Sequence, residues 1–222
     1  MLGLMLFCCS FFCSNQISDT TMIPVTYLAL GDSYTIGEQV SASERFPVQA
    51  AALLREQGFE VTDPEIIATT GWTTDELEAG IAATHISKTY DIVTLLIGVN
   101  NQYRGRSVEE YETEFTALLQ KAIVFAGNNP SHVVVLSIPD WGVTPFAADR
   151  DREQIRREID AYNAANKAIA EEWLVPYLDI THFTREAAHD PELVAGDGLH
   201  PSGKDYSRWA KALLPLLQQA LH

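Results

Sequence analysis

Cysteine is confined to the first 13 residues of this 222-residue chain, at positions 8, 9 and 13. From residue 14 onward the sequence therefore offers no intrachain disulfide, no thiolate nucleophile and no cysteine-based zinc site. Metal-binding patterns are missing as well, because the chain has no H-E-x-x-H motif, no paired histidines and no oxygen-ligand loop. We expect neither a metal nor another cofactor.

Basic residues are scarce. The chain has 15 Lys and Arg against 30 Asp and Glu, a formal net charge of −15. Nucleic-acid binding relies on clustered basic side chains, so no nucleic-acid partner is expected, and anionic membrane surfaces would repel the protein. With 46% hydrophobic and 20% charged residues the composition is that of a folded globular protein. No Pro/Gly/Ser-rich linker divides residues 22–222, which predicts a single domain.

The one long apolar run is at the N-terminus, over residues 1–13, and polar residues 14–21 follow it. Thirteen residues are too few for a stable membrane-spanning helix but suit an export signal. Two features disagree with that reading, because no Lys or Arg precedes Arg45 and no A-x-A cleavage site is evident. We favour export (to a periplasm, the medium or a membrane anchor). The alternative is a cytoplasmic protein whose translation starts at Met22. In either case we place residues 1–21 outside the fold.

Beyond this segment, apolar runs with strand character alternate with stretches of helical periodicity. Such alternation predicts an α/β domain with a parallel sheet and helices on both faces. Ligands of such domains bind at the carboxyl edge of the sheet. The predicted strands are residues 25–31, 65–70, 91–98, 132–139 and 175–180, and the predicted helices are residues 46–57, 73–86, 107–126, 151–173 and 202–221.

Chemically useful residues follow these strands. A G-D-S-Y sequence occupies residues 31–34, a lone glycine stands in T-G-W at 70–72, G-V-N-N covers 98–101, and D-G-L-H-P-S covers 197–202, just before the last helix. Each motif alone has an ordinary explanation as a turn or a helix cap. Together they supply a serine, a histidine three residues after a carboxylate, and an amide side chain, which is complementary chemistry that independent turns have no reason to provide.

A serine hydroxyl becomes a nucleophile when a neighbouring imidazole takes its proton, and a carboxylate must orient that imidazole. Ser33, His200 and Asp197 are the residues that fit these roles. Acyl transfer also needs hydrogen-bond donors for the oxyanion that develops. The candidates are the backbone N–H groups of Ser33 and Gly71 and the side-chain amide of Asn100.

The four motifs, in this order and spacing, resemble the SGNH/GDSL family of serine esterases and lipases. The resemblance implies a flavodoxin-like three-layer α/β/α sandwich with about five parallel strands. It also implies Ser33 as nucleophile, Asp197 and His200 as its partners, and Ser33, Gly71 and Asn100 as the oxyanion hole. Two positions depart from the family pattern: Tyr34 replaces a leucine, which we read as packing, and Asn101 replaces an aspartate, which removes a charge beside the oxyanion hole.

Three aromatic residues, Trp72, Tyr103 and Trp141, follow predicted strands two, three and four. Packing is their ordinary explanation, and the alternative is that they wall an acyl or sugar pocket. We expect a serine ester hydrolase acting on a small ester, a lysophospholipid or a thioester, with carbohydrate O-deacetylation as the alternative. The competing function from another class is a non-catalytic module that binds FMN or phosphate at Ser33 and Thr35.

Overall fold

The computed structural model describes residues 23–222, and the predictions for residues 1–21 therefore fall outside the described part of the chain. Five parallel strands form one sheet in the order β2-β1-β3-β4-β5, which confirms the predicted fold class. The strands are β1 (Tyr27–Gly31), β2 (Glu65–Ala68), β3 (Ile92–Leu96), β4 (Val133–Leu136) and β5 (Tyr177–Leu178). All five are shorter than predicted. Strand β1 begins two residues later than predicted, and in the other four the last predicted residues already belong to the loops at the carboxyl edge.

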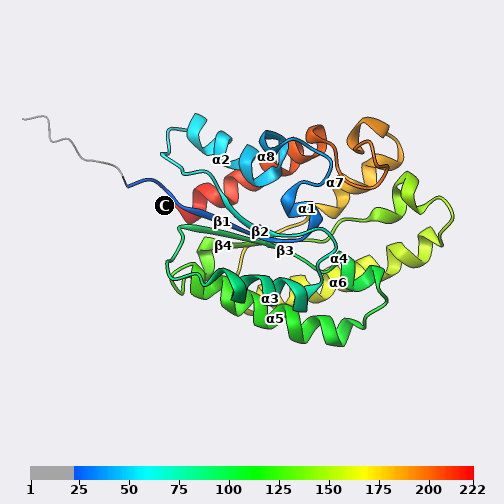
Figure 1. Cartoon of the computed structure of the whole chain (residues 1–222), viewed down its shortest axis with the longest axis horizontal. Helices are drawn as coiled ribbons and strands as arrows, with labels where there is room; N and C mark the ends of the chain where they lie inside the picture. The colour runs from blue at the N-terminus through cyan, green and yellow to red at the C-terminus, as the bar shows by residue number, and fades with distance from the viewer. Residues whose placement is uncertain (1–22) are drawn as a thin grey trace, which may run out of the picture.

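Helices cover both faces of the sheet and make a three-layer sandwich (Figure 1). One face carries α2 (Phe46–Glu56) and α8 (Gly203–Ala220), and the other carries α3 (Thr74–Thr84), α5 (Val108–Phe125) and α6 (Arg152–Glu172). All five correspond to predicted helices. No helix within residues 23–222 combines the length and the apolar character that a bilayer crossing requires.

Three short helices were not predicted, and they begin at or soon after strand ends. They are α1 (Ser33–Ile36), α4 (Val99–Tyr103) and α7 (Thr181–Arg185). Four or five residues are too few to show helical periodicity, so a sequence pattern gives no signal for them. Two of these helices carry functional candidates, because Ser33 opens α1 and Asn100 lies in the first turn of α4.

The register of the sheet brings the strand ends together. Gly31, the last residue of β1, is paired with Ala68 of β2 on one side and with Leu96 of β3 on the other. The chain therefore leaves β1, β2 and β3 at the same level of the same edge. Strands β1 and β3 are buried along their whole length, which fixes this edge on the rigid core of the molecule.

Candidate active site

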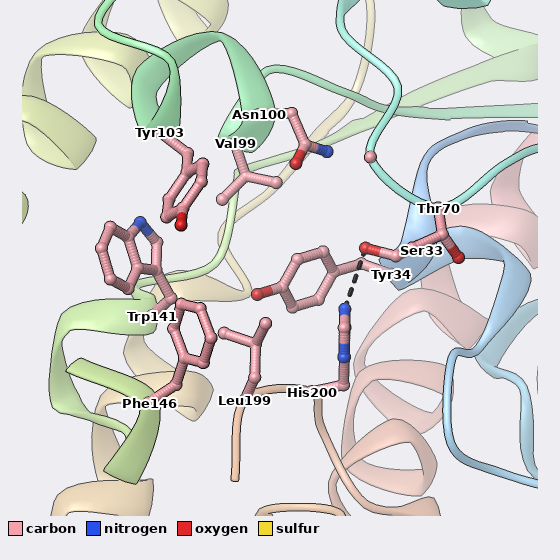
Figure 2. Close-up of a pocket in the computed structure, with 11 residues that line it drawn as sticks. Ser33, Tyr34, Thr70, Val99, Asn100, Tyr103, Trp141, Phe146, Leu199 and His200 are labelled. Atoms are coloured by element: carbon pink, nitrogen blue, oxygen red, sulfur yellow. Dashed lines mark hydrogen bonds between the residues drawn. The ribbon is translucent and has the colours of Figure 1, made fainter. Parts of the chain in front are cut away.

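Ser33 is the first residue of α1 and follows a tight turn from β1. Asp32 is the N-cap of the helix, and its Oδ1 accepts a hydrogen bond from the Tyr34 N–H at 3.0 Å. This local bond ends the strand and starts the helix within one residue, as Asp does at an N-cap. Ser33 is only 4% exposed and its hydroxyl faces a cavity (Figure 2).

The loop before α8 presents His200 to that serine. The Asp197 carboxylate accepts hydrogen bonds from the backbone N–H groups of Leu199 (3.0 Å) and His200 (3.1 Å), which folds the D-G-L-H segment back on itself. The other carboxylate oxygen lies 2.6 Å from Nδ1 of His200. On the far side of the ring, Nε2 lies 3.0 Å from Oγ of Ser33 (Figure 2). The three residues thus form a continuous hydrogen-bonded chain.

The charge on Asp197 fixes the proton positions in this chain. Partial burial raises the pKa of Asp197, but the hydrogen bonds from the His200 ring and from the two backbone N–H groups outweigh it, so the pKa lies below its ordinary value. An ionised carboxylate accepts the proton carried by Nδ1. When the His200 ring is neutral, Nε2 is left with a lone pair directed at the serine hydroxyl, which is the arrangement that a general base requires.

Gly71 and the Ser33 backbone lie at the same cavity. Gly71 has φ +85°, a left-handed conformation that other residues rarely adopt, and a Cβ there would meet only Nη2 of Arg104, at an ordinary contact distance of 3.9 Å. The conformation, rather than crowding, therefore accounts for glycine at this position. Among residues 23–222 no acceptor is present for the N–H of Ser33 or of Gly71. Both donors are free to meet a ligand oxygen.

The Asn100 side chain also lines the cavity, but its amide has partners of its own. Nδ2 donates to the Trp72 carbonyl at 3.0 Å and, over a long 3.4 Å, to Oδ2 of Asp32. The second bond is near the limit of hydrogen bonding, so its hydrogen is the one that a substrate oxyanion can take. The two acceptors also require nitrogen, not oxygen, on this side of the amide.

The cavity above Ser33 has a volume of about 170 Å³ and a mostly apolar wall. Tyr103, Trp141 and Phe146 form an aromatic cluster with ring centroids 5.3–6.3 Å apart. A hydrogen bond of 2.8 Å from the Trp141 indole to Gln102 holds the cluster in place. The residues that line the cavity are Ser33, Tyr34, Thr70, Gly71, Val99, Asn100, Tyr103, Trp141, Phe146, Leu199 and His200.

Two of the three aromatic residues singled out in the sequence line this cavity, and one does not. Tyr103 and Trp141 are in the wall, whereas the Trp72 indole packs over Gly80 of α3, so closely that a Cβ at Gly80 would lie 2.1 Å from the ring. Packing, the ordinary explanation, therefore accounts for Trp72. Its contribution to the site is the backbone carbonyl that binds Asn100.

Other residues that line the cavity were not predicted from the sequence. Phe146 lies in a short 3₁₀ turn after β4, and its N–H donates to the Gly198 carbonyl at 2.9 Å, which ties the aromatic cluster to the His200 loop. Tyr34, read as packing, is buried with its ring 5.0 Å from that of His200. Its hydroxyl points into the cavity toward Trp141 (Figure 2). In the sequence, only the position of Tyr34 next to Ser33 indicates that it could line the cavity.

Comparison with solved structures finds the same fold in several proteins, two of which are described as esterases. TesA matches with a TM-score of 0.69 and 19% identity, covering 88% of this chain and 99% of that one. The esterase EstA from Pseudoalteromonas sp., solved with monoethylphosphonate as inhibitor, matches at 0.67 and 17%, covering 88% and 98%. The acetylxylan esterase Axe2 from Geobacillus stearothermophilus matches at 0.67 and 20%, covering 87% and 94%. A comparison with curated proteins finds no match.

The sequence itself matches one family model. That model describes the GDSL-like lipase/acylhydrolase family and covers residues 29–208, most of the chain. The matched range includes all four motifs and every residue of the hydrogen-bonded chain described above. The protein belongs to the GDSL-like lipase/acylhydrolase family.

Proposed function

We propose that the protein is a serine ester hydrolase that works through an acyl-enzyme on Ser33. The observation that carries the proposal is the hydrogen-bonded chain from Ser33 through His200 to Asp197, with contacts of 3.0 and 2.6 Å. Family membership, which makes the protein an ester-acting hydrolase, supports the same reaction class.

In the proposed mechanism, Oγ of Ser33 attacks the ester carbonyl while Nε2 of His200 takes the hydroxyl proton. The carbonyl oxygen becomes an oxyanion and meets the N–H groups of Ser33 and Gly71 and the amide of Asn100. His200 then returns the proton to the departing alcohol, which leaves an acyl-enzyme. Water, deprotonated by His200, attacks that intermediate and releases the acid. Each oxyanion donor is worth about 3 kcal/mol of barrier.

The cavity wall supports an ester with an apolar acyl or alcohol group. Apart from the Tyr34 hydroxyl, the Gly71 N–H and the polar groups at Ser33, Thr70, Asn100 and His200, the wall is formed by aromatic and aliphatic surface. Burial of apolar surface is the main source of affinity in such a pocket, at about 25 cal/mol per Å². A small or medium-sized ester fits a space of about 170 Å³. Among the substrates considered, this favours small esters and short acyl thioesters.

A carbohydrate O-acetyl ester is the second candidate, and one observation favours it. Tyr103 and Phe146 are 48% and 45% exposed although they border the cavity. Half-exposed aromatic rings at the rim of a site offer flat apolar faces on which a sugar ring can stack. In this variant of the proposal the acetyl group enters the cavity and the sugar stays outside it.

The alternative of an FMN or phosphate module has little support. The Asp32 carboxylate occupies the N-terminus of α1, where a phosphate would have to bind, and Thr35 is fully buried. A carboxylate at that position repels an anion and already satisfies the Tyr34 N–H group.

Replacement of the nucleophile tests the proposal. We expect Ser33→Ala to abolish p-nitrophenyl acetate hydrolysis while thermal unfolding stays close to that of the parent, because only one buried hydroxyl is lost. The matched control is Ser43→Ala, which removes an exposed serine and should keep full activity. Full activity in folded Ser33→Ala would refute the mechanism.

A substrate panel distinguishes the two substrate types. The panel holds p-nitrophenyl esters of increasing acyl length, a short acyl thioester and a peracetylated xylose. If the protein prefers apolar acyl groups and Phe146→Ala changes that preference, the small-ester or thioester substrate is supported. If it prefers the acetylated sugar and Phe146→Ala weakens that preference, the carbohydrate O-acetyl ester is supported.

A further inference from the structure

The turn that carries Gly71 joins β2 to α3 and has few bonds of its own. The Trp72 N–H donates to the Thr69 carbonyl at 3.2 Å, and Asn100 binds the Trp72 carbonyl. Gly71 itself has φ +85° and no side chain to pack. A glycine has more backbone freedom than any other residue, so its amide direction depends on contacts made by its neighbours and by its own carbonyl.

Arg104, at the C-terminal end of α4, makes that contact. Its Nη2 donates to the Gly71 carbonyl at 2.6 Å, whereas another side-chain bond at this turn runs from the Thr70 hydroxyl to Glu38 and leaves Gly71 itself untouched. The same guanidinium binds both carboxylate oxygens of Glu76, at 3.1 Å each. Glu76 in turn accepts from the Thr73 N–H at 2.9 Å and so belongs to the capping box of α3. Arg104 thereby ties Gly71 to the start of α3 and to the end of α4.

Arg106 provides an internal comparison two residues away. It also forms a forked ion pair with the first turn of α3, at 2.7 and 3.4 Å from the Asp75 carboxylate, and it contacts Glu110. It makes no hydrogen bond to the Gly71 turn within residues 23–222. The two arginines therefore share helix docking and differ in the contact to the Gly71 carbonyl.

We propose that Arg104 is a positioning residue that holds the Gly71 amide in the direction the oxyanion requires; the inference rests on the proposed function. Arg104 is exposed and does not line the cavity, so it acts through Gly71 rather than on the substrate. Gly71 carries both the carbonyl that Arg104 binds and the N–H proposed as oxyanion donor. A bond that holds the carbonyl in place therefore also restricts the direction of the N–H. A planar guanidinium held by Glu76 is suited to this task because its donors keep a fixed angle.

The test compares Arg104→Ala with Arg106→Ala on p-nitrophenyl acetate. For Arg104→Ala we expect kcat to fall about 10- to 100-fold with KM changed less than about threefold, because a misplaced donor weakens the transition state rather than substrate binding. Guanidinium or methylguanidinium in the buffer should restore part of the lost kcat. Arg106→Ala should keep kcat within about twofold of the parent and should not respond to guanidinium.

Several results would overturn the inference: an unchanged kcat in Arg104→Ala, an equal loss in Arg106→Ala, or a loss confined to KM. If Arg104→Ala fails to fold, Arg104→Lys replaces it, because lysine keeps the charge and loses the fork; a kcat equal to that of the parent then refutes the proposal. If Ser33→Ala kept the activity of the parent, the proposed function would be refuted instead. Failure of the Arg104 inference and failure of the proposed function are therefore distinguishable.

Discussion

Asp32 is the most unusual ionisable residue of the site. It lies directly before Ser33, is fully buried, and binds the Tyr34 N–H and, weakly, the Asn100 amide. Burial raises its pKa from 3.8 to about 7, and the hydrogen bonds from Tyr34, from Asn100 and from its own backbone only partly oppose that effect. A buried carboxylate with so few donors is held at a cost to stability. The fold keeps it because the same carboxylate starts α1 and so shapes the turn that presents Ser33.

The pKa of Asp32 predicts how stability depends on pH. Between pH 3.8 and about 7 the folded protein keeps a proton that the unfolded chain has lost, so this residue lowers stability progressively as pH rises through that window. Asp32→Asn removes the titration. We expect its free energy of unfolding, relative to the parent, to rise between pH 4 and pH 8 by up to about 4 kcal/mol.

Urea unfolding at several pH values measures this difference. Asp149→Asn, which neutralises an exposed carboxylate, is the control and should follow the pH profile of the parent. A constant difference between Asp32→Asn and the parent from pH 4 to pH 8 would show that Asp32 titrates normally.

At the scale of elements, the junction of α3, α4 and α5 explains the asparagine at position 101. Asn101 is fully buried; its Oδ1 accepts from the Thr74 N–H at 3.1 Å and its Nδ2 donates to the Thr74 hydroxyl at 2.6 Å. The Thr74 hydroxyl donates its single proton to Glu114 of α5. An amide is therefore required, because it both accepts and donates, and an aspartate would only accept.

This network predicts the effect of restoring the family's usual residue. In Asn101→Asp, two carboxylates compete for the one proton of Thr74, and we expect stability at pH 8 to fall by about 1–3 kcal/mol. Glu114→Gln should compensate in the double variant, because a glutamine amide donates to Thr74 and frees its proton for the aspartate. Thermal unfolding of the single and double variants measures both effects. Equal stability of Asn101→Asp and the parent, or no recovery in the double variant, would contradict the network.

At the scale of the whole molecule, the sequence predicts the sheet and the five long helices for two reasons. Burial of one helix face leaves a periodic apolar pattern, and burial of a whole strand leaves a continuous apolar run. Residues 107–126 illustrate this: the capping serine and the buried stripe define α5 to within a residue or two. The motif residues were predictable for a similar reason, since parallel strands end at a common edge.

Other parts of the site have no such pattern. Phe146 reaches the cavity through a 3₁₀ turn that follows no helix or strand periodicity, and Arg104 acts through a backbone carbonyl that any residue could present. Trp72 is the opposite case, a residue that follows a strand end in the sequence but does not line the cavity. Its side chain packs over Gly80 instead. Contacts between loops depend on the folded arrangement of several segments, which a local pattern does not encode.

In the proposed mechanism Ser33 is the residue that becomes acylated, and covalent labelling tests this assignment more directly than any loss of activity. The protein would be treated with a p-nitrophenyl alkylphosphonate, whose phosphorus takes the place of the ester carbonyl, and its mass and peptides would then be measured. We predict one phosphonyl group per chain, located on Ser33, formed in step with loss of p-nitrophenyl acetate hydrolysis and much more slowly in His200→Gln. Complete inactivation with Ser33 unmodified, or a label on another residue, would show that Ser33 is not the nucleophile.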